Sequence, residues 1–353
     1  MTTDNASNWI FAPCKVVNEA ATQAALEHQS TLTKPAGSLG KLESLAVKFA
    51  GWQASEFPRL DNITVRVFAA DHGVCAKGVS AFPQAVTAQM VANFADGGAA
   101  ICVLSRQIGA DFAVVNLGTV NAIEAGDNVI ACVIAPGTGD FSEQPAMNSA
   151  QLAQALMAGK RSVEAGRMDL FIGGEMGIGN TTSASALYSA LLDLPPEKTV
   201  GPGTGVDRRG MEIKCGVIDR ALSLHGAQLN SPLDIMRCLG GFEIAALSGA
   251  YIACAQRGIP ALVDGFIATA AALVAVRLNP GVNDWLLFSH RSAEPAHVLA
   301  LQALRGEPLL DLGMRLGEGS GAAVAVPILQ SALNLHRQMA TFEQASVSDT
   351  QVR

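Results

Sequence analysis

The stretch DLFIGGEMGIGNTTSASALYSALL, residues 169–192, contains a complete strand-to-helix unit. An apolar run enters a glycine-rich turn, and Asn180 then opens an alanine-rich helical segment. The same order of apolar run, polar glycine turn and alanine-rich segment recurs along the chain from Ile63 onward. This alternation predicts an α/β fold in which right-handed crossover helices connect a mostly parallel sheet.

Seven runs are the candidate strands of this sheet. Together with the turns that follow them, they cover residues 63–73, 110–119, 128–140, 168–177, 233–243, 259–266 and 284–290. Ligands of such sheets bind outside the carboxyl ends of the strands, so polar residues in these turns are candidate site residues. They are Asp71, His72, Glu175, Glu243 and Asp264.

The two ends of the chain have a different pattern. Residues 20–32 and 40–53 have helical spacing, as does the chain after Ser320. We therefore expect a small helical subdomain built from both termini, residues 1–60 plus about 320–353. Beside it we expect a large α/β domain, residues 61–319, that carries the active site.

The composition excludes several classes of protein. The 353 residues are 49% hydrophobic and 16% charged, which suits one large α/β unit. The longest apolar run, residues 261–276, contains Asp264 and is too short to span a bilayer. A net charge of −7 without a basic run argues against nucleic acid as a partner.

The cysteines and histidines also limit the possibilities. Seven cysteines are scattered singly without a CxxC pair, and the N-terminus lacks the basic region of a signal peptide. We therefore expect a reduced, cytoplasmic protein. Neither the cysteines nor the histidines show the spacing of a metal site, so no metal is expected. No other cofactor is expected either.

The glycine-rich turn that opens at residue 173 has the features of a phosphate site. Glycines let the backbone approach an anion, and the free amides and positive dipole of the following helix stabilise it. Asn180, Thr181 and Thr182 stand at the start of that helix. The turn has neither the Gly-Lys-Ser/Thr of a P-loop nor the GxGxxG of dinucleotide sites. The alternative is an ordinary strand-to-helix turn with a threonine cap.

A second glycine turn, GPGTGVDRRGMEIK at residues 201–214, precedes another predicted helix. Cations near a helix N-terminus oppose the helix dipole, and an anionic ligand would explain their presence. Arg208 and Arg209 fit an exposed face. Lys214, between Ile213 and Cys215, is the better candidate to reach a bound anion.

The segment from residue 69 to residue 90 offers a third group of candidates. Asp71 and His72 form either a catalytic pair or a hydrogen-bonded turn, and the sequence leaves both open. Further on, Phe82 provides an apolar wall, while Ser80 and Gln89 provide hydrogen bonds. A flat aromatic ligand would fit these residues.

Glu318 is isolated between glycines in GMRLGEGSGAAV, residues 313–324, just before a predicted helix. The dipole of that helix would lower the pKa of the carboxyl group, whereas burial beside Met314 and Leu316 would raise it. A general base that works near neutral pH needs the raised pKa. Glu318 is therefore either a general base or an acid that interacts with the helix that Ser320 caps.

With these residues, the chain resembles the nicotinate-nucleotide–dimethylbenzimidazole phosphoribosyltransferases. The likeness covers nearly the whole chain and is carried by collinear motifs, among them LTKPAGSLGKLE, AADHGVCAKGVSAFPQAVTAQM, GGEMGIGNTTSASAL and LGMRLGEGSGAAVAVPILQSA. The resemblance implies a doubly wound, Rossmann-like sheet, a small helical domain from both termini and a homodimer.

The resemblance also implies roles for individual residues. Glu318 matches the catalytic base of the family. The site for the mononucleotide and its phosphate matches Glu175, Gly177, Gly179, Asn180, Thr181, Thr182, Gly203 and Lys214. The benzimidazole pocket matches Ser80, Phe82, Gln89 and Leu316. Position 82 departs from the expected tyrosine, so a hydrogen bond from that ring is absent in this chain.

The implied reaction transfers the phosphoribosyl group of nicotinate mononucleotide to 5,6-dimethylbenzimidazole with inversion at C1′. The products are nicotinate and α-ribazole phosphate, the lower-ligand nucleotide of cobalamin. The pyridinium ring leaves without a proton, whereas the incoming benzimidazole must lose one, so a single base such as Glu318 suffices. The expected partners are therefore these small molecules. Two alternatives are a non-catalytic sensor of phosphoribosyl ligands and an NAD-linked oxidoreductase, and the missing GxGxxG counts against the latter.

Overall fold

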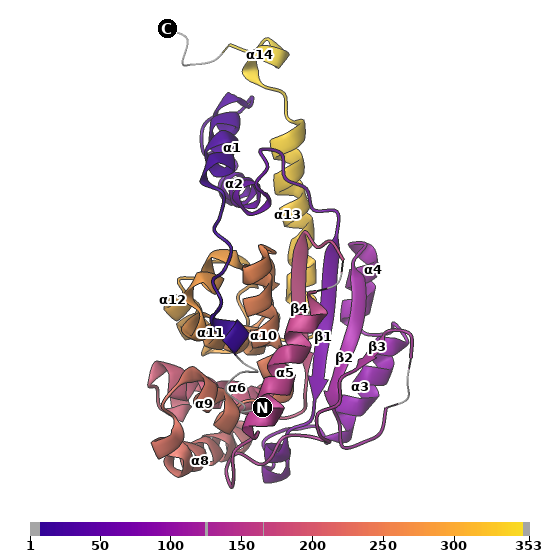
Figure 1. The fold of residues 1–353 in the computed structure, drawn as a ribbon, viewed down its shortest axis with the longest axis vertical. Coiled ribbons are helices and arrows are strands. Elements are labelled where there is room, and N and C mark those ends of the chain that lie inside the picture. Colours follow the sequence, from indigo (N-terminus) through magenta and orange to yellow (C-terminus); the bar gives the residue numbers. More distant parts are fainter. Residues whose placement is uncertain (1–7, 124–125, 165, 349–353) are drawn as a thin grey trace.

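A seven-stranded parallel sheet forms the centre of the computed structural model, which describes residues 8–123, 126–164 and 166–348 (Figure 1). The strand order is β3-β2-β1-β4-β5-β6-β7, and every neighbouring pair is parallel. The strands are β1 Ile63–Ala70, β2 Asp111–Gly118, β3 Val129–Ala131, β4 Leu170–Met176, β5 Ala261–Val263, β6 Leu286–His290 and β7 Pro308–Leu310. The predicted parallel α/β sheet is confirmed. Because the order reverses between β1 and β4, a crevice for a ligand is expected at their carboxyl ends.

Helices cover both faces of the sheet, which makes the fold doubly wound. One face is packed by α3 Ala85–Ala95, α4 Ala100–Gln107 and α13 Ser320–Gln338. The other face is packed by α5 Ser149–Ser162, α10 Phe242–Arg257 and α11 Phe266–Leu278. The remaining helices are α1 Glu19–Thr31, α2 Lys41–Gln53, α6 Asn180–Leu192, α7 Pro196–Thr199, α8 Arg208–His225, α9 Pro232–Leu239, α12 His297–Leu304 and α14 Phe342–Ala345. Short 3-10 helices lie at Asn8–Phe11, Gly73–Lys77, Gly226–Gln228 and Pro280–Trp285.

The core lies between the sheet and these helix layers. Strands β1 and β4 are buried along nearly their whole length, as expected of parallel strands that are covered on both sides. Helix α10 is buried from Phe242 to Ala255 and packs closely against α5. A side chain at Gly249 would place its Cβ 2.2 Å from the carbonyl oxygen of Leu156, so only glycine permits this approach.

The helices from the two ends of the chain pack together. Helices α1 and α2 lie beside α13, at the end of the molecule opposite α8 and α9 (Figure 1). The buried ring of His336 on α13 donates from Nε2 to the carbonyl oxygen of Glu56 at 2.8 Å, and its Nδ1 accepts from the side-chain amide of Gln29 at 2.8 Å. The first half of α13, however, packs on the sheet. The division into residues 1–60 with about 320–353 and residues 61–319 therefore stays a prediction, and residues 1–7 and 349–353 lie outside the described residues.

The sequence-based prediction of a strand within residues 233–243 is wrong. This segment is helix α9 followed by the start of α10, which places Glu243 in a helix rather than in a turn after a strand. Ser231 caps α9 by accepting the amide hydrogen of Asp234, and Pro232 occupies the first helical position. These are strong helix-start signals that outweigh the apolar run. The short edge strand β7 was not among the predicted strands.

Two further findings bear on the class of protein. Among the described residues, no helix combines the length and apolar character needed to cross a membrane. All seven cysteines are free thiols, in agreement with the expected absence of a disulfide framework.

Candidate active site

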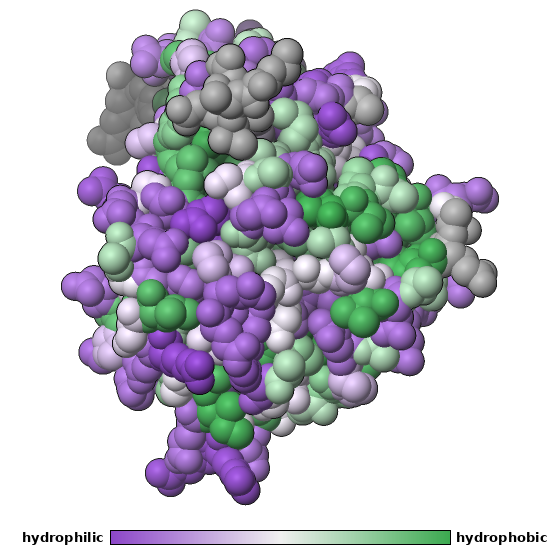
Figure 2. Space-filling view, turned by 60° about the horizontal axis from the view of Figure 1, so that its bottom comes forward, coloured by the Kyte–Doolittle hydropathy of each residue, from purple (hydrophilic) through white to green (hydrophobic). Residues whose placement is uncertain are grey.

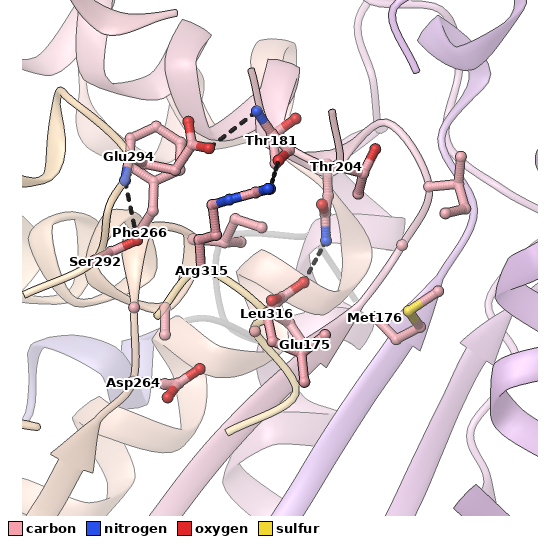
Figure 3. Close-up of a pocket in the computed structure, with 18 of the residues that line it drawn as sticks. Glu175, Met176, Thr181, Thr204, Asp264, Phe266, Ser292, Glu294, Arg315 and Leu316 are labelled. Atoms are coloured by element: carbon pink, nitrogen blue, oxygen red, sulfur yellow. Dashed lines mark hydrogen bonds between the residues drawn. The ribbon is translucent and has the colours of Figure 1, made fainter. Parts of the chain in front are cut away.

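A pocket opens at the carboxyl ends of β4, β5 and β6, and several predicted site residues line it (Figure 3). Those residues are Glu175, Gly177, Asn180, Thr181, Gly203 and Leu316. The walls are turns that follow strands, which is where the parallel sheet predicts a ligand. Within the part of the chain that the structure describes, no group of three or more metal-ligating side chains is present.

The glycine turn of the pocket ends at α6. A side chain at Gly177 would place its Cβ 2.6 Å from the carbonyl oxygen of Ala70, so this turn fits tightly against β1. Gly179 is the N-cap residue, with φ of 98° and no side-chain cap, and the first turn of α6 contains no acidic residue. The alternative of a threonine cap is therefore wrong: the N-cap is Gly179, and Thr182, the third residue of the helix, is fully buried. Neither Gly179 nor Thr182 lines the pocket, but the uncapped helix start remains suited to an anion.

Lys214 brings a buried positive charge to this helix start. Its side chain is 1% exposed, and its Nζ donates to Thr181 Oγ1 at 2.8 Å and to the carbonyl oxygen of Gly201 at 3.2 Å. Burial lowers the pKa of Lys214 to about 8, although the nearby Glu294 carboxylate raises it. The direct hydrogen-bond partners of Lys214 are neutral, so a bound anion would stabilise its buried charge further, which supports the predicted role of Lys214.

Glu294 and Arg315 are pocket residues that sequence reasoning missed. The Glu294 carboxyl group accepts the amide hydrogen of Gly203 at 2.9 Å, and Arg315 Nη1 donates to the carbonyl oxygen of Gly203 at 2.9 Å (Figure 3). Together they fix the second glycine turn. Burial raises the pKa of Glu294, against the effect of Lys214. Glu294 lies just beyond the predicted strand 284–290. Because ligands bind outside the carboxyl ends of parallel strands, its position could have marked it as a candidate from the sequence.

Glu175 ends β4 and is 6% exposed. The Asn180 side-chain amide donates to its Oε2. Burial, followed by repulsion from the Glu243 carboxylate, raises the pKa of Glu175 to about 8. At neutral pH this carboxyl group is therefore mostly protonated and adds little negative charge to an anion-binding pocket.

Glu318 is 6% exposed and lies directly on β4. A side chain at Gly174 would place its Cβ 2.2 Å from the carbonyl oxygen of Glu318, so the glycine is required for this contact. Burial, with a contribution from the Asp264 carboxylate, raises the pKa of Glu318 to about 7, against the lowering effect of the Ile101 amide of α4. The effects that raise the pKa of Glu318 therefore outweigh those that lower it, a balance that the sequence alone left open. Its Oε2 has no hydrogen-bond partner among the described residues.

The remaining predicted residues are only partly included in this pocket. Gly317 lines the pocket next to Glu318, whereas Glu318 itself, Ser80, Phe82 and Gln89 lie outside that lining. Phe82 is 48% exposed and Leu316 is 58% exposed. Figure 2 shows that hydrophobic residues reach the surface in separate patches at this end of the molecule. The predicted benzimidazole pocket is therefore not enclosed by this single chain.

Asp71 and His72 do not form a pair with each other. The Nε2 atom of His72 lies 2.6 Å from Glu243 Oε1, and both side chains are fully buried. Asp71 instead accepts the amide hydrogen of Val120 at 2.9 Å. Of the two alternatives for this segment, a hydrogen-bonded turn agrees better with this geometry.

Comparison with known proteins gives one consistent result. A family model described as phosphoribosyltransferase matches residues 14–347. The nicotinate-nucleotide–dimethylbenzimidazole phosphoribosyltransferase of Xanthomonas oryzae is 58% identical over 97% of this chain and 99% of its own. The protein with that name in Azotobacter vinelandii is 56% identical over 97% of this chain and 98% of its own.

A solved structure agrees with these relatives. The crystal structure of the nicotinate-nucleotide–dimethylbenzimidazole phosphoribosyltransferase from Thermus thermophilus superposes with a TM-score of 0.88 at 40% identity, covering 94% of this chain and 99% of that one. Because the family model and the relatives span nearly the whole chain, this protein belongs to the nicotinate-nucleotide–dimethylbenzimidazole phosphoribosyltransferase family.

Proposed function

We propose that this protein transfers the phosphoribosyl group of nicotinate mononucleotide to 5,6-dimethylbenzimidazole with inversion at C1′. The products are α-ribazole phosphate, for the lower ligand of cobalamin, and nicotinate. Family membership supports the activity, and one observation carries the mechanism. Glu318, next to the pocket residue Gly317, has a buried carboxyl group with a pKa of about 7, and its Oε2 has no hydrogen-bond partner among the described residues.

In this proposal the pocket holds the mononucleotide by its phosphate. The start of α6, the Gly203 turn and the Lys214 ammonium group supply amides and a charge to the phosphate oxygens. Protonation of Glu175 keeps the pocket from repelling the ligand. The contacts to the phosphate are remote from C1′, so their binding energy serves to orient the reacting carbon.

The chemical step needs only one protein group. The bond from C1′ to the pyridinium nitrogen breaks, and its electron pair leaves with the ring as neutral-nitrogen nicotinate. One nitrogen of the benzimidazole forms the new bond to C1′ from the opposite face, which changes the β configuration to α. The proton on the other nitrogen passes to Glu318, which acts as the general base. Ser80, Phe82, Gln89 and Leu316 are proposed to hold the benzimidazole ring beside it.

Incubation of the protein with nicotinate mononucleotide and dimethylbenzimidazole tests the function. Chromatography is expected to show release of nicotinate, and NMR of the other product is expected to show the α configuration at C1′. Release that depends on the benzimidazole excludes simple hydrolysis. Binding of the mononucleotide without any turnover would instead support the alternative of a non-catalytic sensor.

The rate is expected to depend on pH in a bell-shaped manner. Glu318 must be ionised to accept a proton, so kcat/KM rises with pH through its pKa of about 7. Lys214 must be charged and Glu175 protonated to hold the phosphate, so kcat/KM falls above their pKa values of about 8. Initial rates between pH 5 and pH 10 measure this profile. A rate that still rises between pH 8 and pH 10 would contradict these assignments.

Two further proposals concern the oligomeric state and the cellular location of the protein. We propose a homodimer on the strength of the family resemblance, which light scattering of the purified protein tests directly. We also propose a cytoplasmic location, supported by the seven free thiols.

A further inference from the structure

Asp264 links the sheet to the turn that carries Glu318. It follows β5 directly and is 2% exposed. Both of its carboxyl oxygens accept backbone amide hydrogens from the start of α13. Oδ2 accepts from Gly319 at 3.2 Å, and Oδ1 accepts from Ala322 at 2.9 Å.

These two amides are the ones that a capping box would satisfy. Gly319 is the N-cap residue of α13 and has no side chain to contribute, and Ala322 is the third residue of the helix. In a capping box, the N-cap side chain accepts from that third amide, and the side chain of the third residue accepts from the N-cap amide. Asp264 makes both bonds from a different element of the fold.

The backbone at Glu318 requires such support. Its φ is +65°, and the flanking Gly317 and Gly319 both have φ of +85°. Three consecutive left-handed residues are unusual, and a residue with a side chain adopts this conformation only where the surrounding structure holds it. The bond from Gly319 to Asp264 fixes the backbone on one side of Glu318, and the contact with Gly174 fixes its carbonyl group.

We propose that Asp264 is the positioning residue of the general base: by capping α13 from the end of β5, it holds Glu318 in its left-handed conformation beside the pocket. This inference rests on the role proposed above for Glu318. Asp264 itself also lines the pocket, but its two oxygens are engaged by α13 rather than free for a substrate.

The charge of Asp264 adds a second effect. Repulsion from this carboxylate contributes to the raised pKa of Glu318. The ionisable groups that face Glu318 or Asp264 from neighbouring elements are Glu175 on β4, His290 at the end of β6, whose Nδ1 lies 3.8 Å from Asp264 Oδ1, Cys102 on α4 and Tyr251 on α10. All of them are retained when only residue 264 is changed.

The experiment compares two variants. Asp264→Asn removes the charge and leaves one acceptor for two amides, so kcat is expected to fall about 10- to 100-fold, as for other small misplacements of a catalytic group. The acidic limb of the kcat profile is expected to move to lower pH, because a charge that raises the pKa of Glu318 is gone. Asp264→Glu keeps the charge but displaces the oxygens, so kcat falls while the acidic limb stays at its wild-type pH.

Calorimetry separates positioning from substrate binding. The Kd of nicotinate mononucleotide is expected to stay unchanged in both variants. A raised Kd with normal kcat would make Asp264 a substrate-binding residue and overturn the proposal. A wild-type kcat in Asp264→Asn would also overturn it, as would a loss of kcat in Asp264→Asn without movement of the acidic limb of that variant. If circular dichroism shows that Asp264→Asn does not fold, a wild-type kcat in Asp264→Glu is the overturning result.

Two further variants complete the design. Asn148→Ala removes the capping box of α5, away from the pocket, and is expected to change neither kcat nor the acidic limb. Glu318→Gln, measured in parallel, tests the proposed function on its own. If Glu318→Gln retains turnover, the base is wrongly assigned. If Glu318→Gln is inactive while both Asp264 variants are normal, only the positioning role of Asp264 fails.

Discussion

Glu318→Gln is expected to lower kcat by about two to four orders of magnitude, the usual contribution of a general base. The amide has the size of the carboxyl group but cannot accept the proton that the benzimidazole loses. Burial of Glu318 means that little else in its surroundings can replace it. The acidic limb of the pH profile near pH 7 should disappear with it, since that limb reports the ionisation of Glu318.

Steady-state kinetics and calorimetry check this prediction together. The Kd of the mononucleotide is expected to stay at its wild-type value, because Glu318 is not among the residues proposed to hold the phosphate. Glu175→Gln is the matched control. It mimics the protonated form that prevails at neutral pH, so most activity should remain. Near-normal turnover in Glu318→Gln would remove Glu318 from the mechanism.

Lys214→Met is expected to weaken mononucleotide binding by about 10- to 100-fold, because a hydrogen bond to a charged group contributes about 1.5–3 kcal/mol. Methionine fills a similar volume without the charge. The fall of kcat/KM above pH 8 should become shallower, since one of the two groups that cause it is removed. Titration calorimetry with the mononucleotide measures the affinity directly.

The same variant should not lose thermal stability. The pKa of Lys214 is lower in the folded protein than its usual value, so the charged form opposes folding at pH values below about 8. Removing it therefore leaves the melting temperature equal or higher. Lys198→Met, on the exposed end of α7, is the control and should leave both affinity and stability unchanged. An unchanged Kd in Lys214→Met would place the phosphate elsewhere.

Much of the fold follows from patterns that depend on neighbours in the sequence. Strands β1, β2 and β4 are apolar runs that end in glycine turns. This is the pattern expected of parallel strands that helices cover on both faces. Lys214 was identified because a cation near a helix start needs an anion. The strand predicted at residues 233–243 is wrong, because the apolar residues there fit a strand whereas Ser231 and Pro232 favour a helix.

The parts of the site that sequence reasoning missed depend on distant contacts. Glu294 and Arg315 both bind the Gly203 turn, which lies 91 and 112 residues away from them in the chain, so no local pattern connects them. The pKa of Glu318 likewise depends on burial against β4 and on the charge of Asp264. Sequence could name the opposing effects on this carboxyl group, but only the packed structure decides between them.

Helix α13 connects two regions of the molecule that are usually considered separately. Its first turn follows Glu318, and its last turn carries His336 among α1, α2 and the chain that leaves α2. Its nineteen residues span about 28 Å and include Pro327, which removes one backbone donor inside the helix. Packing contacts with α1 and α2 at one end of α13 and the turn of Glu318 at its other end are therefore joined by one continuous helix. Two helices from the N-terminal part of the described chain thus contact the same helix that follows the proposed base, although no residue of α1 or α2 lines the pocket.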